Sequence, residues 1–160
     1  MSEAQAESLI GVSSGHYSSI TMSKSEYPSN DINAGYAETY NTTSGSGHEQ
    51  EAVYVTSNQT AVYESVYEST SYLRQLFNQS YLSSPGATNI SISFNDSVDG
   101  MTYMSSSFSL VSLGYGEENG VIVIGEKDNV VIVAVVDNPT QIPTASSVTS
   151  VLAGDITLNI

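Results

Sequence analysis

The sequence predicts an α+β fold built on an antiparallel sheet of about five or six strands, with one main helix over residues 60–82. Two aliphatic runs, Val121–Ile124 and Val130–Val136, are separated by five polar or glycine residues, a spacing typical of a hairpin. Residues 89–94 alternate aliphatic or aromatic side chains with polar ones, which favours a strand with one face in solvent. Apolar residues within 60–82 recur at intervals of three to five, which favours a helix.

The aliphatic hairpin is expected at the centre of the sheet. Neither of its runs alternates with polar residues, so both faces of both strands should be covered. The sequence leaves two candidates for the cover of the second face: the helix of this chain, or another subunit. A membrane span is excluded because no run approaches the roughly 18 apolar residues that it requires.

The N-terminal third is predicted to be extended or loosely structured. Residues 1–50 are rich in turn and linker residues and poor in aliphatic ones, and we interpret them as a candidate assembly arm. Within this region a short helix is expected over residues 2–10, ending at Gly11, with short strands around residues 17–22 and 36–40. Residues 51–160 are expected to form a single α+β domain.

That domain should begin with a strand over residues 52–57, and Ser57 or Asn58 should cap the main helix. A further strand is expected over residues 103–113. Near the end, one or two helical turns should stop at Gly154, and residues 155–160 should form a final alternating strand.

Charge and composition exclude several classes of partner. The net charge is −14, with Lys24, Arg74 and Lys127 as the cationic side chains. Such a chain repels phosphate backbones, so nucleic-acid binding is not expected. An acidic, lysine-poor surface is typical of halophilic proteins, whose self-repulsion is screened by salt. The chain has no cysteine, which excludes disulfides and thiolate sites.

No sequence motif predicts an enzyme or a cofactor. Residues 11–15, GVSSG, match a nucleophile elbow around Ser13, but only ten residues precede them, too few to build a hydrolase sheet. His16 and His48 lack a third metal ligand. Residues 95–100, NDSVDG, resemble a calcium loop without its final glutamate, so Asp96 and Asp99 are weak cation candidates within a predicted turn.

Two groups of residues indicate a surface role. Five asparagines begin the N-x-S/T pattern and are candidate glycosylation sites: Asn41, Asn58, Asn78, Asn89 and Asn95. Tyrosines, which are common in protein interfaces, provide four candidate interface residues in the N-terminal region: Tyr17, Tyr27, Tyr36 and Tyr40.

Three functional hypotheses follow. The favoured one is a non-enzymatic structural subunit of an assembly, such as a virion head or tail component or a surface filament, whose partners are copies of itself or other subunits. Its location would be the virion or the extracellular surface, and the start of the sequence carries no secretory signal peptide. The alternative is an extracellular or cell-surface binding module, with a pocket lined by tyrosine and convergent polar groups. An enzyme would instead show a cleft with a carboxylate or histidine of perturbed pKa.

Overall fold

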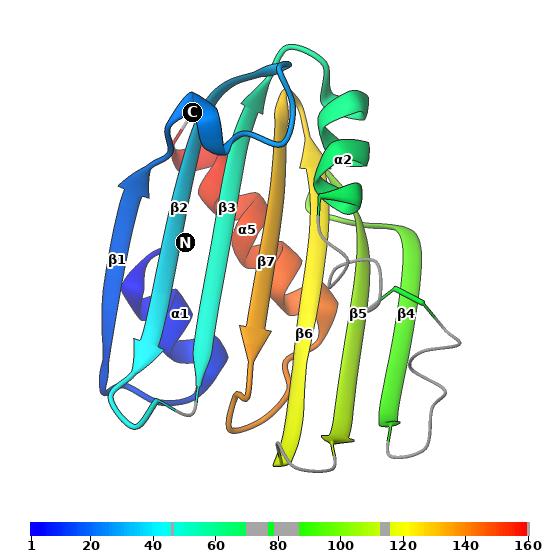
Figure 1. The fold of residues 1–160 in the computed structure, drawn as a ribbon. Helices are drawn as coiled ribbons and strands as arrows, with labels where there is room; N and C mark the ends of the chain where they lie inside the picture. Colours follow the sequence, from blue (N-terminus) through cyan, green and yellow to red (C-terminus); the bar gives the residue numbers. More distant parts are fainter. Residues whose placement is uncertain (46, 70–76, 79–86, 113–115, 160) are drawn as a thin grey trace.

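The computed structural model describes residues 1–45, 47–69, 77–78, 87–112 and 116–159 (Figure 1). Its helices and strands, in chain order, are α1 (Glu3–Ile10), β1 (Gly15–Thr21), the 3-10 helix η1 (Lys24–Glu26), β2 (Ile32–Thr42), β3 (His48–Thr56), α2 (Gln59–Glu68), β4 (Ala87–Val98), β5 (Met101–Ser112), β6 (Gly116–Lys127), β7 (Val130–Asp137) and α5 (Ala145–Asn159).

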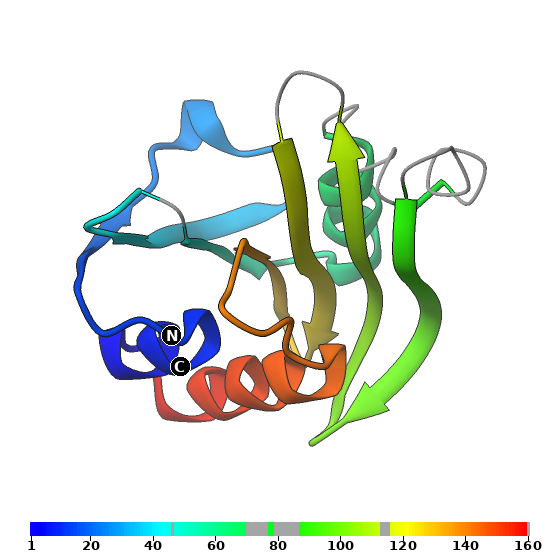
Figure 2. The same ribbon diagram turned by 90° about the horizontal axis from the view of Figure 1, so that it is seen from below.

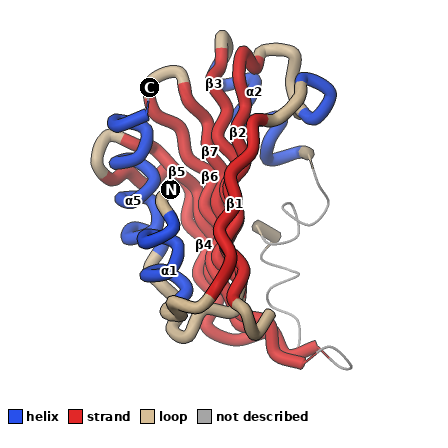
Figure 3. Tube along the Cα trace, turned by 90° about the vertical axis from the view of Figure 1, so that its left-hand side faces the viewer, coloured by secondary structure: helices blue, strands red, loops and turns tan. Residues whose placement is uncertain are grey.

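The strands form one antiparallel sheet of seven strands, in the order β1-β2-β3-β7-β6-β5-β4, where five or six were expected. After β3 the chain passes through α2 to β4 at the opposite edge, and three hairpins lead back to β7 beside β3. Helices α1 and α5 lie on one face of this sheet and α2 on the other (Figures 2 and 3). The result is a three-layer arrangement with a core on each face of the sheet.

The aliphatic hairpin occupies the centre of the sheet, as predicted, and the chain covers both of its faces itself. Val121 and Val123 of β6 pack in the core under α1 and α5, whereas Ile122 and Ile124 pack in the core under α2. The hairpin loop is shorter than expected. Strand β6 continues to Lys127, which pairs with Val130, so only two residues form the turn.

Residues 1–50 are not a loose arm, which corrects the prediction. They form α1, β1, β2 and the start of β3, and the expected domain boundary after residue 50 falls inside β3. The helix expected over residues 2–10 is present as α1. Ser2 and Gln5 form a capping box at its start, and Gly11, in the left-handed conformation at φ 79°, ends the helix. The prediction rested on the low aliphatic content of these residues. The strands instead contribute tyrosines, such as the fully buried Tyr40, to the core.

The main helix is confirmed in its first part. Helix α2 begins after Asn58, whose side chain accepts a hydrogen bond from the Ala61 backbone, and it buries Val62 and Val66. The remainder of the range predicted as helix, apart from residues 77–78 and Ser69, lies outside the described residues.

The helical turns predicted before Gly154 are present, but the predicted stop at Gly154 and the strand after it are wrong. Residues 145–159 form α5, and the helix continues through Gly154 and the region expected to be a strand. Its buried residues, Val148, Leu152 and Ile156, are spaced by four and pack on the sheet. No helix in the described part of the chain is long and apolar enough to cross a membrane.

Candidate functional site

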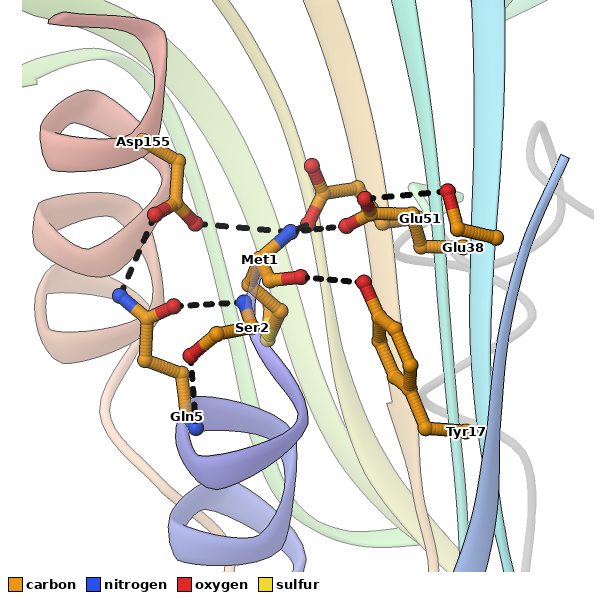
Figure 4. Close-up of polar contacts among 8 residues, drawn as sticks. Met1, Ser2, Gln5, Tyr17, Glu38, Glu51 and Asp155 are labelled. Atoms are coloured by element: carbon orange, nitrogen blue, oxygen red, sulfur yellow. Dashed lines mark hydrogen bonds and ion pairs between the residues drawn. The ribbon is translucent and has the colours of Figure 1, made fainter. Parts of the chain in front are cut away.

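A cluster of four carboxylates and one ammonium group lies between the sheet and the two helices α1 and α5. Strand pairing brings Glu38 of β2 opposite Glu51 of β3. Glu49 lies two residues before Glu51 and therefore on the same face of β3. Helix α5 contributes Asp155, and the α-ammonium group of Met1, just before α1, contacts Glu38, Glu51 and Asp155 (Figure 4).

Three carboxylates contact the Met1 ammonium group. It donates a hydrogen bond of 2.6 Å to Glu51 Oε2, forms a short ion pair with Glu38 Oε2 and lies 3.4 Å from Asp155 Oδ2. The Tyr17 hydroxyl donates to the Met1 carbonyl oxygen at 2.9 Å. These contacts join α1, α5 and the sheet at one point, as Figure 4 shows.

A second hydrogen-bond chain connects the two helices. The Ser2 backbone N–H donates to Gln5 Oε1 at 2.6 Å, and Gln5 Nε2 donates to Asp155 Oδ1 at 3.3 Å. The side chain of Gln5 therefore serves both the capping of α1 and the orientation of the α5 carboxylate.

Burial governs the protonation of this cluster. Desolvation, with the neighbouring charge of Glu51, raises the pKa of Glu49 to about 8. Desolvation also raises the pKa of Glu51, to about 7, although the Met1 ammonium group opposes the change. Burial alone would lower the pKa of that ammonium group, but Glu51 and Glu38 outweigh it and raise the pKa to about 10.

Glu49 is the most unusual member of the cluster. Its side chain is 0% exposed, and within the described part of the chain neither of its carboxylate oxygens has a hydrogen-bond partner. A buried, unpaired carboxylate is costly to ionise, so the protonated form is favoured at neutral pH.

A pocket of about 570 Å³ opens beside the cluster. Met1, Glu38, Glu51 and Asp155 form its charged end. The rest of its lining is contributed by the sheet and α5: Ser19, Ala34, Tyr36, Val53, Val55, Ile132 and Ile156. An apolar wall with a few convergent polar groups is the usual composition of a small-molecule site.

The acidic cluster was not predicted, because residues 48–50 were assigned to the loosely structured N-terminal region and the strand was expected to begin only at Ala52. A signal was present. The alternation that places Val53 and Val55 on one face of the strand also places Glu49 and Glu51 on that face.

The candidate interface tyrosines lie in different environments. Tyr40 is fully buried, and its hydroxyl donates to the Val12 carbonyl oxygen at 2.9 Å. Tyr17 and Tyr27 are half-buried, and Tyr27 packs against the core under α2. Tyr36 is 44% exposed and lines the pocket.

The weak cation candidates do not come together as a metal site. Asp96 lies in β4 and accepts a hydrogen bond from Ser93, while Asp99 precedes the turn glycine Gly100 and accepts one from Ser150. Within the described residues, no group of three or more His, Asp or Glu side chains is arranged to hold a metal ion.

The other sequence candidates are dispersed. Among the sequons, Asn41, Asn58, Asn78 and Asn95 are exposed, and Asn58 also caps α2, whereas the side chain of Asn89 is not among the described ones. Asn41 Oδ1 lies 2.7 Å from His48 Nδ1 across the β2–β3 pair. Ser13 lies in the loop before β1, where it forms no strand-to-helix elbow.

The fold and pocket define a class: one antiparallel sheet with helices on both faces and a pocket with an acidic end between the sheet and α5. No protein-family model matches the sequence, and no curated protein sequence matches it. Among solved structures, the chain is similar to the crystal structure of the extracellular domain of PknH from Mycobacterium tuberculosis. The TM-score is 0.60 at 10% sequence identity, over 100% of this chain and 93% of that one, so the likeness concerns the fold alone.

Proposed function

We propose that this chain is a non-enzymatic binding module that takes a small molecule in the pocket between the sheet and α5. The supporting observation is the pocket itself, whose volume of about 570 Å³ lies within the roughly 300–1,000 Å³ typical of small-molecule sites. It combines apolar residues such as Val53 and Ile132 with Tyr36 and the convergent carboxylates. This is the arrangement expected of a binding module.

The proposed location is extracellular. The domain of PknH that shares this fold is extracellular, and the candidate glycosylation sites Asn41, Asn78 and Asn95 are exposed, as surface modification would require. Both observations support the binding-module hypothesis over the virion hypothesis.

An enzyme would also show carboxylates with a raised pKa, and this chain has two, Glu49 and Glu51. Their environments favour binding over catalysis. Glu49 is completely buried, and Glu51 is 2% exposed and already paired with the Met1 ammonium group. The burial of Glu49 and the pairing of Glu51 support a binding role over proton exchange with a substrate.

The test is a thermal-shift and calorimetric screen of neutral, anionic and cationic small molecules. Ala34 lines the pocket, so Ala34→Leu should fill it and abolish binding of the hits. The matched control is Ala37→Leu, because Ala37 pairs with Ala52 on the α2 side of the sheet. A screen without hits, or hits that Ala34→Leu leaves unchanged, would refute the proposal.

The second candidate remains the structural subunit of an assembly, a virion component or a surface filament. Strands β1 and β4 are the two edges of the sheet, and each exposes a large apolar side chain: Ile20 is 56% exposed and Phe94 51%. Exposed edges are templates for pairing with another chain.

Light scattering in low and in molar salt tests this candidate. A defined oligomer that dissociates in the double variant Ile20→Lys and Phe94→Lys would support assembly through the edges. Removal of residues 1–50 is not a suitable test, because it would delete two strands of the sheet and part of a third. A monomer in both salts would exclude self-assembly of the isolated chain.

A further inference from the structure

The charged end of the pocket already holds an ammonium group, that of Met1. We propose that this end is a recognition site for the ammonium group of an organic cation whose apolar part lies along the pocket wall. In this structure Met1 occupies the position of that group. The inference deepens the proposed binding function and rests on it, since it names the chemical class of the ligand.

The count of charges in the cluster favours a cationic ligand. Glu38, Glu51 and Asp155 contact a single ammonium group, and Glu49 interacts with it electrostatically, so three negative charges are unmatched when all four carboxylates are ionised. An additional cation would be stabilised by this excess, whereas an anion would be repelled.

Glu49 provides an independent observation. It is 0% exposed, and among the described residues no donor reaches either of its carboxylate oxygens. Its charge interacts with those of Glu51, Met1, Glu38 and Asp155, so the carboxylate lies close to the same cluster. Glu49 does not itself line the pocket, so its contribution is electrostatic: when ionised, it adds to the negative potential that attracts a cation to the charged end.

The geometry matches an ammonium group better than a metal ion. An alkylammonium group has three N–H donors, and that of Met1 donates to Glu38 and Glu51 and forms an ion pair with Asp155 at 3.4 Å. The described residues contain no set of metal-holding side chains. Beyond the charged end, Val53, Val55 and Ile132 provide an apolar surface for the ligand body. Tyr36, 44% exposed, offers an aromatic face for a cation.

The test compares hexylammonium with hexanol and hexanoate, which share its chain length and differ in charge. Calorimetric titration at pH 9 keeps the amine charged and lies above the pKa of Glu49 and Glu51, about 8 and about 7. We expect hexylammonium to bind at least about tenfold more tightly than hexanol, or about 1.4 kcal/mol. A chain with Gly-Ser added before Met1, which withdraws the competing ammonium group, should bind it more tightly still.

Matched variants identify the site. Glu51→Gln should weaken hexylammonium binding about tenfold. Glu64→Gln on α2 should leave it unchanged, although Glu64 is exposed and its loss alters the net charge equally. Should Glu51→Gln fail to fold, Glu38→Gln replaces it, because Glu38 is partly exposed and also contacts the ammonium group.

Equal binding of hexanol, or insensitivity to both cluster variants, would overturn the inference. If hexylammonium does not bind while neutral compounds bind and are blocked by Ala34→Leu, the ammonium inference fails and the proposed binding function stands. If no compound of any class binds, both fail.

Discussion

Glu38 and Glu51 lie directly opposite each other on β2 and β3, and their carboxylates face α1 and α5. Like charges in this position of an antiparallel pair are destabilising. Here both carboxylates contact the Met1 ammonium group, so a third group compensates the repulsion. Glu49, two pairs further along, has no hydrogen-bond partner among the described residues, and its protonated form is favoured instead.

This arrangement predicts that stability falls as pH rises. A carboxyl group with a folded-state pKa above its unfolded value keeps its proton longer in the folded state, so folding is favoured at low pH and loses that advantage as pH increases. For Glu49 the window runs from about 4.5 to about 8, and for Glu51 to about 7. We expect a loss on the order of 2 kcal/mol between pH 5 and 8, measured by urea unfolding.

Glu49→Gln isolates the main contributor. A neutral amide removes the titration, so the variant should show a flatter profile and exceed the parent chain in stability at pH 8. The exposed Glu64→Gln should retain the parent slope. A parent profile that rises with pH from 5 to 8, or a Glu49→Gln profile of unchanged slope, would contradict the assigned role of Glu49.

The central hairpin predicts the largest effects on packing. Ile122 is 0% exposed and packs in the core under α2. Ile122→Ala should cost about 2–5 kcal/mol, because it removes buried methylene groups and leaves a cavity. Ile20→Ala is the control, since Ile20 is 56% exposed on the edge strand, and should change stability by less than about 0.5 kcal/mol. Equal effects in chemical denaturation would refute a core position for Ile122.

How far the sequence predicts this fold depends on whether burial coincides with apolar composition. In the hairpin the two coincide, because β6 and β7 are covered on both faces by the same chain. In the N-terminal strands they do not, because tyrosine, threonine and glutamate occupy inward positions such as Tyr40, Thr42 and Glu49. Such residues are fully buried less often than aliphatic ones, so composition underestimated how much of the N-terminal region is buried in the sheet.

The pocket depends on contacts that no local pattern encodes. Met1, Glu51 and Asp155 are far apart in sequence, and only the meander β1–β3 together with the packing of α5 brings them together. The alternation along β3 could have placed Glu49 and Glu51 inward, but not their partners.

The net charge of −14 predicts a strong response to salt. Charges of one sign repel one another in the compact state, and molar salt screens them beyond a distance of about 3 Å. We expect the melting temperature in 2 M NaCl to exceed that in 20 mM NaCl. Sodium sulfate at matched ionic strength controls for anion type. No increase in either salt would argue against the proposed halophilic adaptation.

Alanine substitutions at two glycines test whether the C-terminal segment is the helix observed in the structure or ends at Gly154, as the sequence favours. Gly154 lies inside α5, and a Cβ atom there would meet no atom within 4 Å. Gly154→Ala should therefore stabilise the protein by roughly 0.5–1 kcal/mol through helix propensity.

Gly120 provides the contrasting variant. A Cβ atom at Gly120 would lie 2.4 Å from the Val136 carbonyl oxygen, so Gly120→Ala should destabilise the sheet. If Gly154 instead ended a helix in the left-handed conformation, alanine would be destabilising there as well. Urea unfolding of both variants separates these cases, because only an interior helical position makes their effects opposite in sign.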